Sequence, residues 1–465
     1  MQLLETVRTP EDAGCSSKEI LRFLDAAHAA GVDFHSMLIL RHGKVACRLN
    51  WAPYDEHTPH ILFSLSKSFC SAAAGFAVSE GLLRWDDRVV DILPDCLPPA
   101  PSERLRKITL AHLLTMGSGL DEKSDLPPAQ EQSWEKYALA CEVLHEPGTH
   151  FHYNSHGTYL VSCMVQRVAG MNIRDYLMPR LFDKLAIPMP TWDLSPTGVC
   201  VGGWGLRLST DSLARFGQCL LERGMWRGER VLPENWVERA TQKQIENFEN
   251  DPTSDWQQGY GYQFWRTRGG RFRGDGMFGQ VCMVDEARQM VVVCTAGIND
   301  MGVEMNLLND TLFSAGALEQ GTQQQQRELA RRAEALAYLP PEGSAHAPVN
   351  CRISQSQQGW LQLTQKASGE PLLLQLERAE EPLHMELTLG CGAYLESAYQ
   401  EDNPTAPPIR ILAAYGWLGE RLHLIARTPD GPFLLDMHIT FEGGKAVLES
   451  RNVGFPFVSG DAECQ

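Results

Sequence analysis

The chain has 465 residues, of which 43% are hydrophobic and 21% are charged. This composition is ordinary for a globular protein, and the length is sufficient for two domains or more. The formal net charge of -17 at pH 7 argues against a nucleic acid or an anionic membrane surface as partner.

Neither the N-terminal residues nor the cysteines indicate export. The N-terminus has no basic segment followed by an apolar core, and no apolar run approaches a membrane-spanning length. We therefore expect a cytoplasmic protein. The 13 cysteines are scattered through apolar contexts and form no Cys-x-x-Cys pair, which predicts reduced core cysteines and neither disulfides nor zinc ligands.

The first elements are predicted to be a helix followed by a β-hairpin. Residues 17–31 carry apolar side chains at helical spacing and end at a glycine. Two alternating segments, 36–41 and 44–49, flank His42-Gly43, and this pattern is typical of two antiparallel strands joined by a tight turn.

The stretch from Phe63 to Cys70 holds the central candidate site. It reads Phe-Ser-Leu-Ser-Lys-Ser-Phe-Cys and continues into a small, apolar run through Ala77, which predicts a buried helix with Ser64 as its first residue. Lys67 lies one turn further on the same face. A buried amine can take the proton of a serine hydroxyl, and the N–H groups of a helix N-terminus can stabilise an oxyanion.

The Ser-x-x-Lys spacing alone is a weak signal, because two fixed residues recur by chance in a chain of this length. A second copy, Ser133-Trp-Glu-Lys136, lies in a polar stretch. Ser64 is distinguished by an apolar entry at residues 61–63 and by the alanine-rich continuation that would bury Lys67.

The order of these elements resembles the serine β-lactamase and penicillin-binding-protein superfamily, most closely its class C-like esterase and amidase branch. Residues 81–89 (Gly-Leu-Leu-Arg-Trp-Asp-Asp-Arg-Val) and 108–120, which contain His112-Leu-Leu-Thr and end in Ser-Gly-Leu, are similar to segments of that family. The resemblance extends over roughly residues 8–317. It implies an α+β fold, a β-lactamase-like α/β sandwich in which an antiparallel sheet is flanked by helices, with an additional all-helical region.

The family's second catalytic element is Tyr-x-Asn, and the matching residues here are Tyr153-Asn154-Ser155. The resemblance implies that Tyr153 passes the proton of Ser64 to the leaving group, as general base and then acid. Ser155 replaces the usual asparagine and becomes a candidate for substrate binding. Without the resemblance, a tyrosine in an aromatic turn would be interpreted as packing.

A glycine turn at residues 202–205 leads into an amphipathic helix and is similar to a third element of the family. Ser209 or Thr210 is expected to cap that helix. Trp204 is a candidate to line the substrate cleft, with a core tryptophan as the alternative.

Residues 260–295 predict a strand meander whose edge borders the site. The family carries Lys-Thr-Gly or His-x-Gly here, and the matching residues are Asp275-Gly276-Met277. A carboxylate in place of the cation would repel an anionic substrate, so we rank ester or amide hydrolysis above β-lactam turnover. Arg271 and Arg273 are candidates to compensate, although alternation leaves their direction open. The backbone N–H groups of Ser64 and of Phe278 are expected to form the oxyanion hole.

The two predicted domains are residues 1–338 and 345–465. A helical pattern over 304–317 closes the first, and Pro340-Pro341 marks the boundary. Short alternating strands follow at 360–364, 372–376, 384–389, 422–426 and 434–439. They predict a small antiparallel β-barrel or β-sandwich without a catalytic constellation.

The predicted function is a serine hydrolase that forms an acyl-enzyme on small ester or amide substrates, with no metal and no organic cofactor. A homodimer is possible. Two alternatives stay open: a β-lactamase or D-amino-acid peptidase or transpeptidase with the same mechanism, and a catalytically impaired binding or scaffold protein.

Overall fold

The computed structural model describes residues 4–121, 131–343, 349–355, 359–367, 370–378, 384–400, 408–442, 445–454 and 460–464. The chain forms two compact units. The first comprises Met1–Asn50, Asp55–Ala296 and Asp300–Ala335, and the second comprises Trp51–Tyr54, Gly297–Asn299 and Leu336–Gln465. Two short segments that interrupt the first unit along the chain thus belong to the second unit, which no sequence pattern indicated.

A seven-stranded sheet forms the centre of the first unit, in the order β1-β3-β2-β12-β11-β10-β9. Its strands are β1 (Glu5–Thr6), β2 (Asp33–Arg41), β3 (Lys44–Asn50), β9 (Trp265–Thr267), β10 (Arg271–Gly276), β11 (Gln280–Asp285) and β12 (Met290–Gly297). The hairpin β2–β3 and the meander β9–β12 pair antiparallel as predicted, whereas β1 runs parallel to β3.

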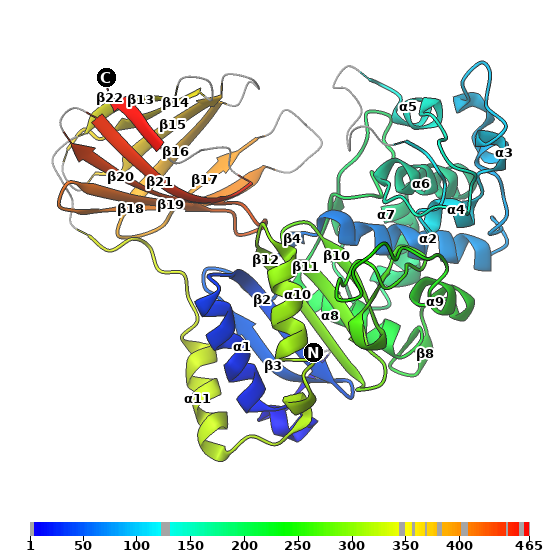
Figure 1. Cartoon of the computed structure of the whole chain (residues 1–465), viewed down its shortest axis with the longest axis horizontal. Helices are drawn as coiled ribbons and strands as arrows, with labels where there is room; N and C mark the ends of the chain where they lie inside the picture. Colours follow the sequence, from blue (N-terminus) through cyan, green and yellow to red (C-terminus); the bar gives the residue numbers. More distant parts are fainter. Residues whose placement is uncertain are drawn as a thin grey trace. The chain divides into compact units, whose positions relative to one another are not determined.

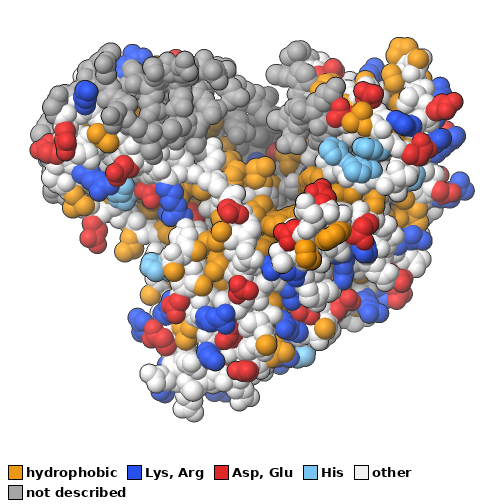
Figure 2. Space-filling view, viewed as in Figure 1, with side chains coloured by type: hydrophobic (Ala, Val, Ile, Leu, Met, Phe, Trp, Pro, Cys, Tyr) orange, Lys and Arg blue, Asp and Glu red, His pale blue; other side chains and the backbone are white. Residues whose placement is uncertain are grey.

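Helices cover both faces of this sheet. The amphipathic helix α1 (Ser17–Ala29) packs with α10 (Met301–Asp310) and α11 (Gln323–Glu334), while α8 (Thr210–Leu221) packs against β2 and β11. Figure 1 shows α10 in front of the strands and α8 behind them. In Figure 2, acidic and basic side chains are mixed over the visible face of this unit.

A helical region adjoins the sheet, and its central helix is α2. The region contains α2 (Ser66–Ser79), α3 (Val89–Ile92), α4 (Leu110–Leu114), α5 (Trp134–Ala140), α6 (Ser155–Ala169), α7 (Ile173–Leu177) and α9 (Glu234–Thr241). Small residues let α2 be buried from Ser66 to Ala77 and pack closely against α6. The predicted α+β architecture, a mostly antiparallel sheet flanked by helices with an additional helical region, is confirmed.

Short elements complete the first unit. They are the three-stranded sheet of β4 (His60–Ile61), β6 (Leu206–Leu208) and β5 (Thr191–Trp192), and the pair β7 (Met225–Trp226) and β8 (Glu229–Arg230). Thr109 caps α4, since its side chain accepts a hydrogen bond from the backbone N–H of His112.

The second unit is built on a ten-stranded, mostly antiparallel sheet in the order β16-β15-β14-β13-β22-β21-β20-β19-β18-β17. The strands are β13 (Asn350–Gln355), β14 (Gly359–Thr364), β15 (Leu372–Arg378), β16 (His384–Cys391), β17 (Leu395–Tyr399), β18 (Ile409–Leu418), β19 (Arg421–Arg427), β20 (Leu434–Glu442), β21 (Lys445–Val453) and β22 (Gly460–Cys464). A parallel pairing between β16 and β18 joins the two end regions of the sheet. Alternate side chains, such as Leu422 and Leu424, enter an apolar core.

One expectation about the cysteines was wrong. Cys351 is disulfide-bonded, whereas Cys70 and Cys294 are free and buried, as expected of core cysteines. The sequence did not indicate the disulfide because no spacing pattern marks Cys351. In the described part of the chain, no helix combines the length and the apolarity that crossing a membrane requires.

Candidate active site

Ser64 lies in a tight turn directly before α2. The turn is the 3-10 helix η2 (Phe63–Leu65), and α2 begins two residues after Ser64, so the serine precedes the helix that was expected to start with it. The hydroxyl of Ser66 accepts a hydrogen bond from the backbone N–H of Leu206 at 3.1 Å. Leu65 and Ser66 are fully buried. The turn that carries the candidate nucleophile is therefore held firmly in place.

The amine of Lys67 is the centre of a small polar cluster. Its Nζ lies 3.1 Å from Oγ of Ser64, 3.1 Å from Oγ of Ser155 and 2.9 Å from the carbonyl oxygen of Gly203. The lysine is only 1% exposed. Three oxygens of uncharged groups thus surround three possible N–H donors in a buried position.

Tyr153 approaches this amine with its ring. Nζ of Lys67 lies 4.9 Å from the ring centroid, within the range of a cation–π contact. The ring stacks on that of Trp265, with centroids 5.3 Å apart and an angle of 12° between the planes. The edge of Tyr260 completes the aromatic surround at 6.4 Å. The structure therefore brings two segments of the chain, one with Ser64 and Lys67 and the other with Tyr153, close together.

Ser155 and Gly203 owe their positions to local capping and turn geometry. Ser155 is the first residue of α6, whose N-cap is Asn154; the amide oxygen of Asn154 accepts from the backbone N–H of Gly157 at 2.5 Å. Gly203 follows Gly202, which has a φ of 72° that favours glycine. Sequence reasoning treated these glycines as structural and missed the Gly203 carbonyl, since a backbone acceptor leaves no mark on residue type.

Trp204 follows this carbonyl in the chain. Its backbone oxygen accepts a hydrogen bond from Nε1 of Trp192 at 2.9 Å, and its half-buried ring lies 6.3 Å from that of Trp134. Trp204 thus directly follows the residue whose carbonyl accepts from Lys67, but these two contacts involve neither Ser64 nor Lys67, and its place in a substrate cleft stays a prediction.

The end of β10 lies directly against the nucleophile turn. A methyl group built on Gly276 would stand 2.1 Å from the carbonyl oxygen of Leu62, and one built on Gly274 would stand 2.7 Å from Oγ of Ser68. Only glycine allows this approach at Gly276. Beyond the strand, Phe278 has a φ of 67° and its ring lies 5.3 Å from that of Phe63. The two backbone segments expected to form the oxyanion hole are therefore neighbours.

Asp275 alternates with these glycines. It is 7% exposed, and its Oδ2 lies 2.8 Å from Nη2 and 3.0 Å from Nε of Arg273, a residue with no exposed surface. Nε1 of Trp256 donates to the same oxygen at 3.2 Å. Arg273 is thus the compensating cation that the sequence left open, whereas Arg271 pairs with Asp285 at 3.8 Å. The positive charge of Arg273 therefore offsets the negative charge of Asp275 that was expected to repel an anionic substrate.

A buried carboxyl group that the sequence did not single out lies close to this ion pair. Glu304 on α10 is fully buried, and Sγ of Cys294 contacts its Oε1 at 3.3 Å. Its Oε2 has no hydrogen-bond partner among the described residues. Burial raises the pKa of Glu304 to about 8, and the nearby charge of Asp275 acts in the same direction.

Comparison with known proteins identifies the family of the chain. The sequence matches the beta-lactamase family over residues 23–317, which is more than half of the chain. The protein therefore belongs to the beta-lactamase family.

Two curated relatives show the range of activities among similar proteins. The chain is 26% identical over 285 residues to the 6-aminohexanoate-dimer hydrolase of Paenarthrobacter ureafaciens, an alignment that covers 56% of this chain and 71% of that protein. It is 30% identical over 165 residues to the acyltransferase mokF of Monascus pilosus, covering 30% of this chain and 40% of that protein.

Solved structures are similar in fold. EstCE1, described as a hydrolase with promiscuous acyltransferase activity, superimposes with a TM-score of 0.53 at 18% identity, covering 64% of this chain and 98% of that one. The structure of SurE with D-Leu superimposes with a TM-score of 0.51 at 17% identity and covers 98% of this chain and 97% of that one.

Proposed function

We propose that this protein is a serine hydrolase that acts on small esters or amides through an acyl-enzyme. The observation that carries the proposal is the position of the Lys67 amine, 3.1 Å from the Ser64 hydroxyl and buried against the Tyr153 ring. Desolvation disfavours a charged amine, and a neutral amine can accept the serine proton.

The proposed reaction has two halves. Oγ of Ser64 attacks the substrate carbonyl carbon while Lys67 takes the hydroxyl proton, and the N–H groups of Ser64 and Phe278 hold the oxyanion. Tyr153 passes the proton to the leaving alcohol or amine as the carbonyl–oxygen or carbonyl–nitrogen bond breaks. Water then attacks the acyl-enzyme, its proton returns through the same groups, and the acid leaves as the Ser64 ester bond breaks.

The acceptor in the second half need not be water. An alcohol that attacks the acyl-enzyme would give a new ester. One relative, mokF, is named an acyltransferase, and EstCE1 is described as a hydrolase with promiscuous acyltransferase activity. We propose hydrolysis as the principal reaction and transfer to added alcohols as a side reaction.

A β-lactamase or D-amino-acid peptidase remains the second candidate, and the ion pair of Asp275 favours keeping it. Because Arg273 balances the carboxylate, an anionic substrate meets less repulsion here than the sequence implied. Comparing turnover of a chromogenic cephalosporin with that of short p-nitrophenyl esters separates the two candidates; we expect the esters to be the better substrates.

The decisive test is covalent labelling with a fluorophosphonate probe. We expect the wild-type protein to be labelled and the Ser64→Ala variant to remain unlabelled. Ser133→Ala, which removes the serine of the second Ser-x-x-Lys, is the matched control and should label normally. Failure of the folded wild type to react would leave the third possibility, a binding or scaffold protein.

A further inference from the structure

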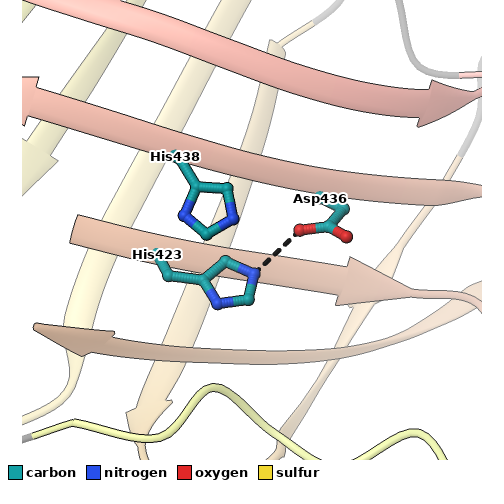
Figure 3. Close-up of side chains that lie close together, drawn as sticks. All are labelled: His423, Asp436 and His438. Carbon is teal, nitrogen blue, oxygen red and sulfur yellow. Dashed lines mark hydrogen bonds and ion pairs between the residues drawn. The ribbon is translucent and has the colours of Figure 1, made fainter. Parts of the chain in front are cut away.

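Three side chains with metal-binding atoms meet on strands β19 and β20 of the second unit. His423 of β19 is the direct cross-strand partner of His438 of β20. Asp436 precedes His438 by two residues, so all three side chains lie on one face of the sheet. One potential ligand atom from each lies within 4.8 Å of the other two. Figure 3 shows the three side chains grouped over the two strands.

The spacing is close to what one ion requires. Nε2 of His423 lies 2.8 Å from Oδ1 of Asp436, and the two imidazole rings are stacked with centroids 4.0 Å apart. Figure 3 shows one ring nitrogen of each histidine on the side of Asp436. Two atoms that share a zinc ion at about 2.0–2.1 Å each lie at most about 4.2 Å apart. Because the three ligand atoms already lie within 4.8 Å of one another, small side-chain rotations suffice to bring them to these distances.

The backbone beneath these side chains is well fixed. Leu422 and Leu424 flank His423 in the chain and are fully buried in the core of the sheet, so His423 faces the other way. Both strands are also paired with outer neighbours, β18 and β21. The side chains of His423 and Asp436 are 25% and 27% exposed, which leaves them open to an ion from solvent.

We propose that His423, Asp436 and His438 bind a divalent transition-metal ion, for which Zn²⁺ is the best match. Two imidazoles and one carboxylate are typical zinc ligands, and a water molecule would complete a tetrahedral site. The ion would join β19 to β20 through side chains, in addition to their backbone hydrogen bonds. The rival interpretation is a His423–Asp436 hydrogen bond with a stacked imidazole and no affinity for metal.

The test is a calorimetric titration with ZnCl₂ of the whole chain, from which metal has first been removed with a chelator and by dialysis. We expect one Zn²⁺ ion to bind tightly to each chain. Asp436→Asn and His438→Ala should each weaken binding by more than about 100-fold, because even loss of a group that only supports a ligand costs up to about that factor. Circular dichroism establishes that each variant is folded.

The matched control is His150→Ala, since His145 and His150 form another close pair of rings at 4.1 Å. This variant should still bind one Zn²⁺ ion tightly. Titration with Co²⁺ supplies an independent readout, because visible absorption reports a tetrahedral nitrogen and oxygen site and should vanish in Asp436→Asn. Absence of a tightly bound Zn²⁺ ion in the wild type, or its persistence in folded Asp436→Asn and His438→Ala, would overturn the proposal.

Discussion

Oδ2 of Asp275 and Nη2 of Arg273 lie 2.8 Å apart on a face of β10 that is almost completely buried. The pair places a balanced set of charges beside the candidate active site, at the position where the family that the sequence resembles carries a lysine or a histidine and this sequence has a carboxylate. Its two members are separated by one residue on the same strand, so they lie on the same face.

Arg273→Met should destabilise the protein by about 3–5 kcal/mol, because it leaves the buried carboxylate of Asp275 without its cation. The double variant Arg273→Met, Asp275→Asn should recover a large part of that loss. Urea unfolding of both variants and the wild type measures the difference. Equal destabilisation of the single and double variants would show that the arginine acts through packing and not through its charge.

Lys67→Met should reduce the rate of fluorophosphonate labelling by at least about 100-fold, since general-base assistance contributes about 10²–10⁴-fold. The aliphatic side chain suits the buried position, so the fold should persist. Lys136→Met, in the second Ser-x-x-Lys, serves as the control and should label at the wild-type rate. A labelling rate for Lys67→Met equal to that of the wild type would exclude Lys67 as the base.

Tyr153→Phe should lower kcat for ester hydrolysis by about 100-fold while leaving the thermal midpoint nearly unchanged. The phenylalanine ring keeps the contacts with Trp265 and Lys67 and loses only the hydroxyl that we assign to proton transfer. Tyr260→Phe provides the comparison, because that ring also borders Tyr153. If both variants lose activity equally, the loss is caused by altered packing of the aromatic rings and not by the Tyr153 hydroxyl.

Glu304 should make the protein less stable as the pH rises. Its folded-state pKa of about 8 lies above the ordinary value of 4.5, so the folded state binds the proton more tightly. The stability that this proton provides is complete below pH 4.5 and is lost as the pH rises through about 8. The loss amounts to at most about 1.4 kcal/mol per pH unit within that interval.

Glu304→Gln removes this titration. We expect its free energy of unfolding to fall less than that of the wild type between about pH 5 and about pH 8. Denaturant unfolding at several pH values measures both slopes. Parallel pH profiles for the two proteins would show that folding does not raise the pKa of Glu304.

Much of the first unit was predictable from the sequence because its signals are local. The hairpin at His42-Gly43, the cap at Thr109 and the alternation in the meander each depend on neighbouring residues, and each is present. In the second unit, strands were predicted at the places of β14, β15, β16, β19 and β20, whereas β13, β17, β18, β21 and β22 were not predicted. In β18 (Ile409–Leu418), the consecutive residues from Ala413 to Trp417 are all buried and show no alternation.

The site was predictable only as far as residue type reveals it. Ser64, Lys67 and Tyr153 were named from motifs, but the Gly203 carbonyl is a backbone group and Arg273 could not be oriented without the strand. The cluster of His423, Asp436 and His438 was missed for a similar reason. Its members become neighbours only through the cross-strand register of β19 and β20, which no spacing in the sequence encodes.

The close approach of Gly276 to Leu62 also has a consequence for protein engineering. Because any β-carbon at residue 276 would stand 2.1 Å from the Leu62 carbonyl oxygen, this strand position accepts no diversity, and a saturation library that included it would consist largely of misfolded members. The adjoining Met277 is 52% exposed, so a change of side chain there does not have to fit into a packed core. A variant library at this edge of the sheet should therefore randomise Met277 and hold its glycine neighbour fixed.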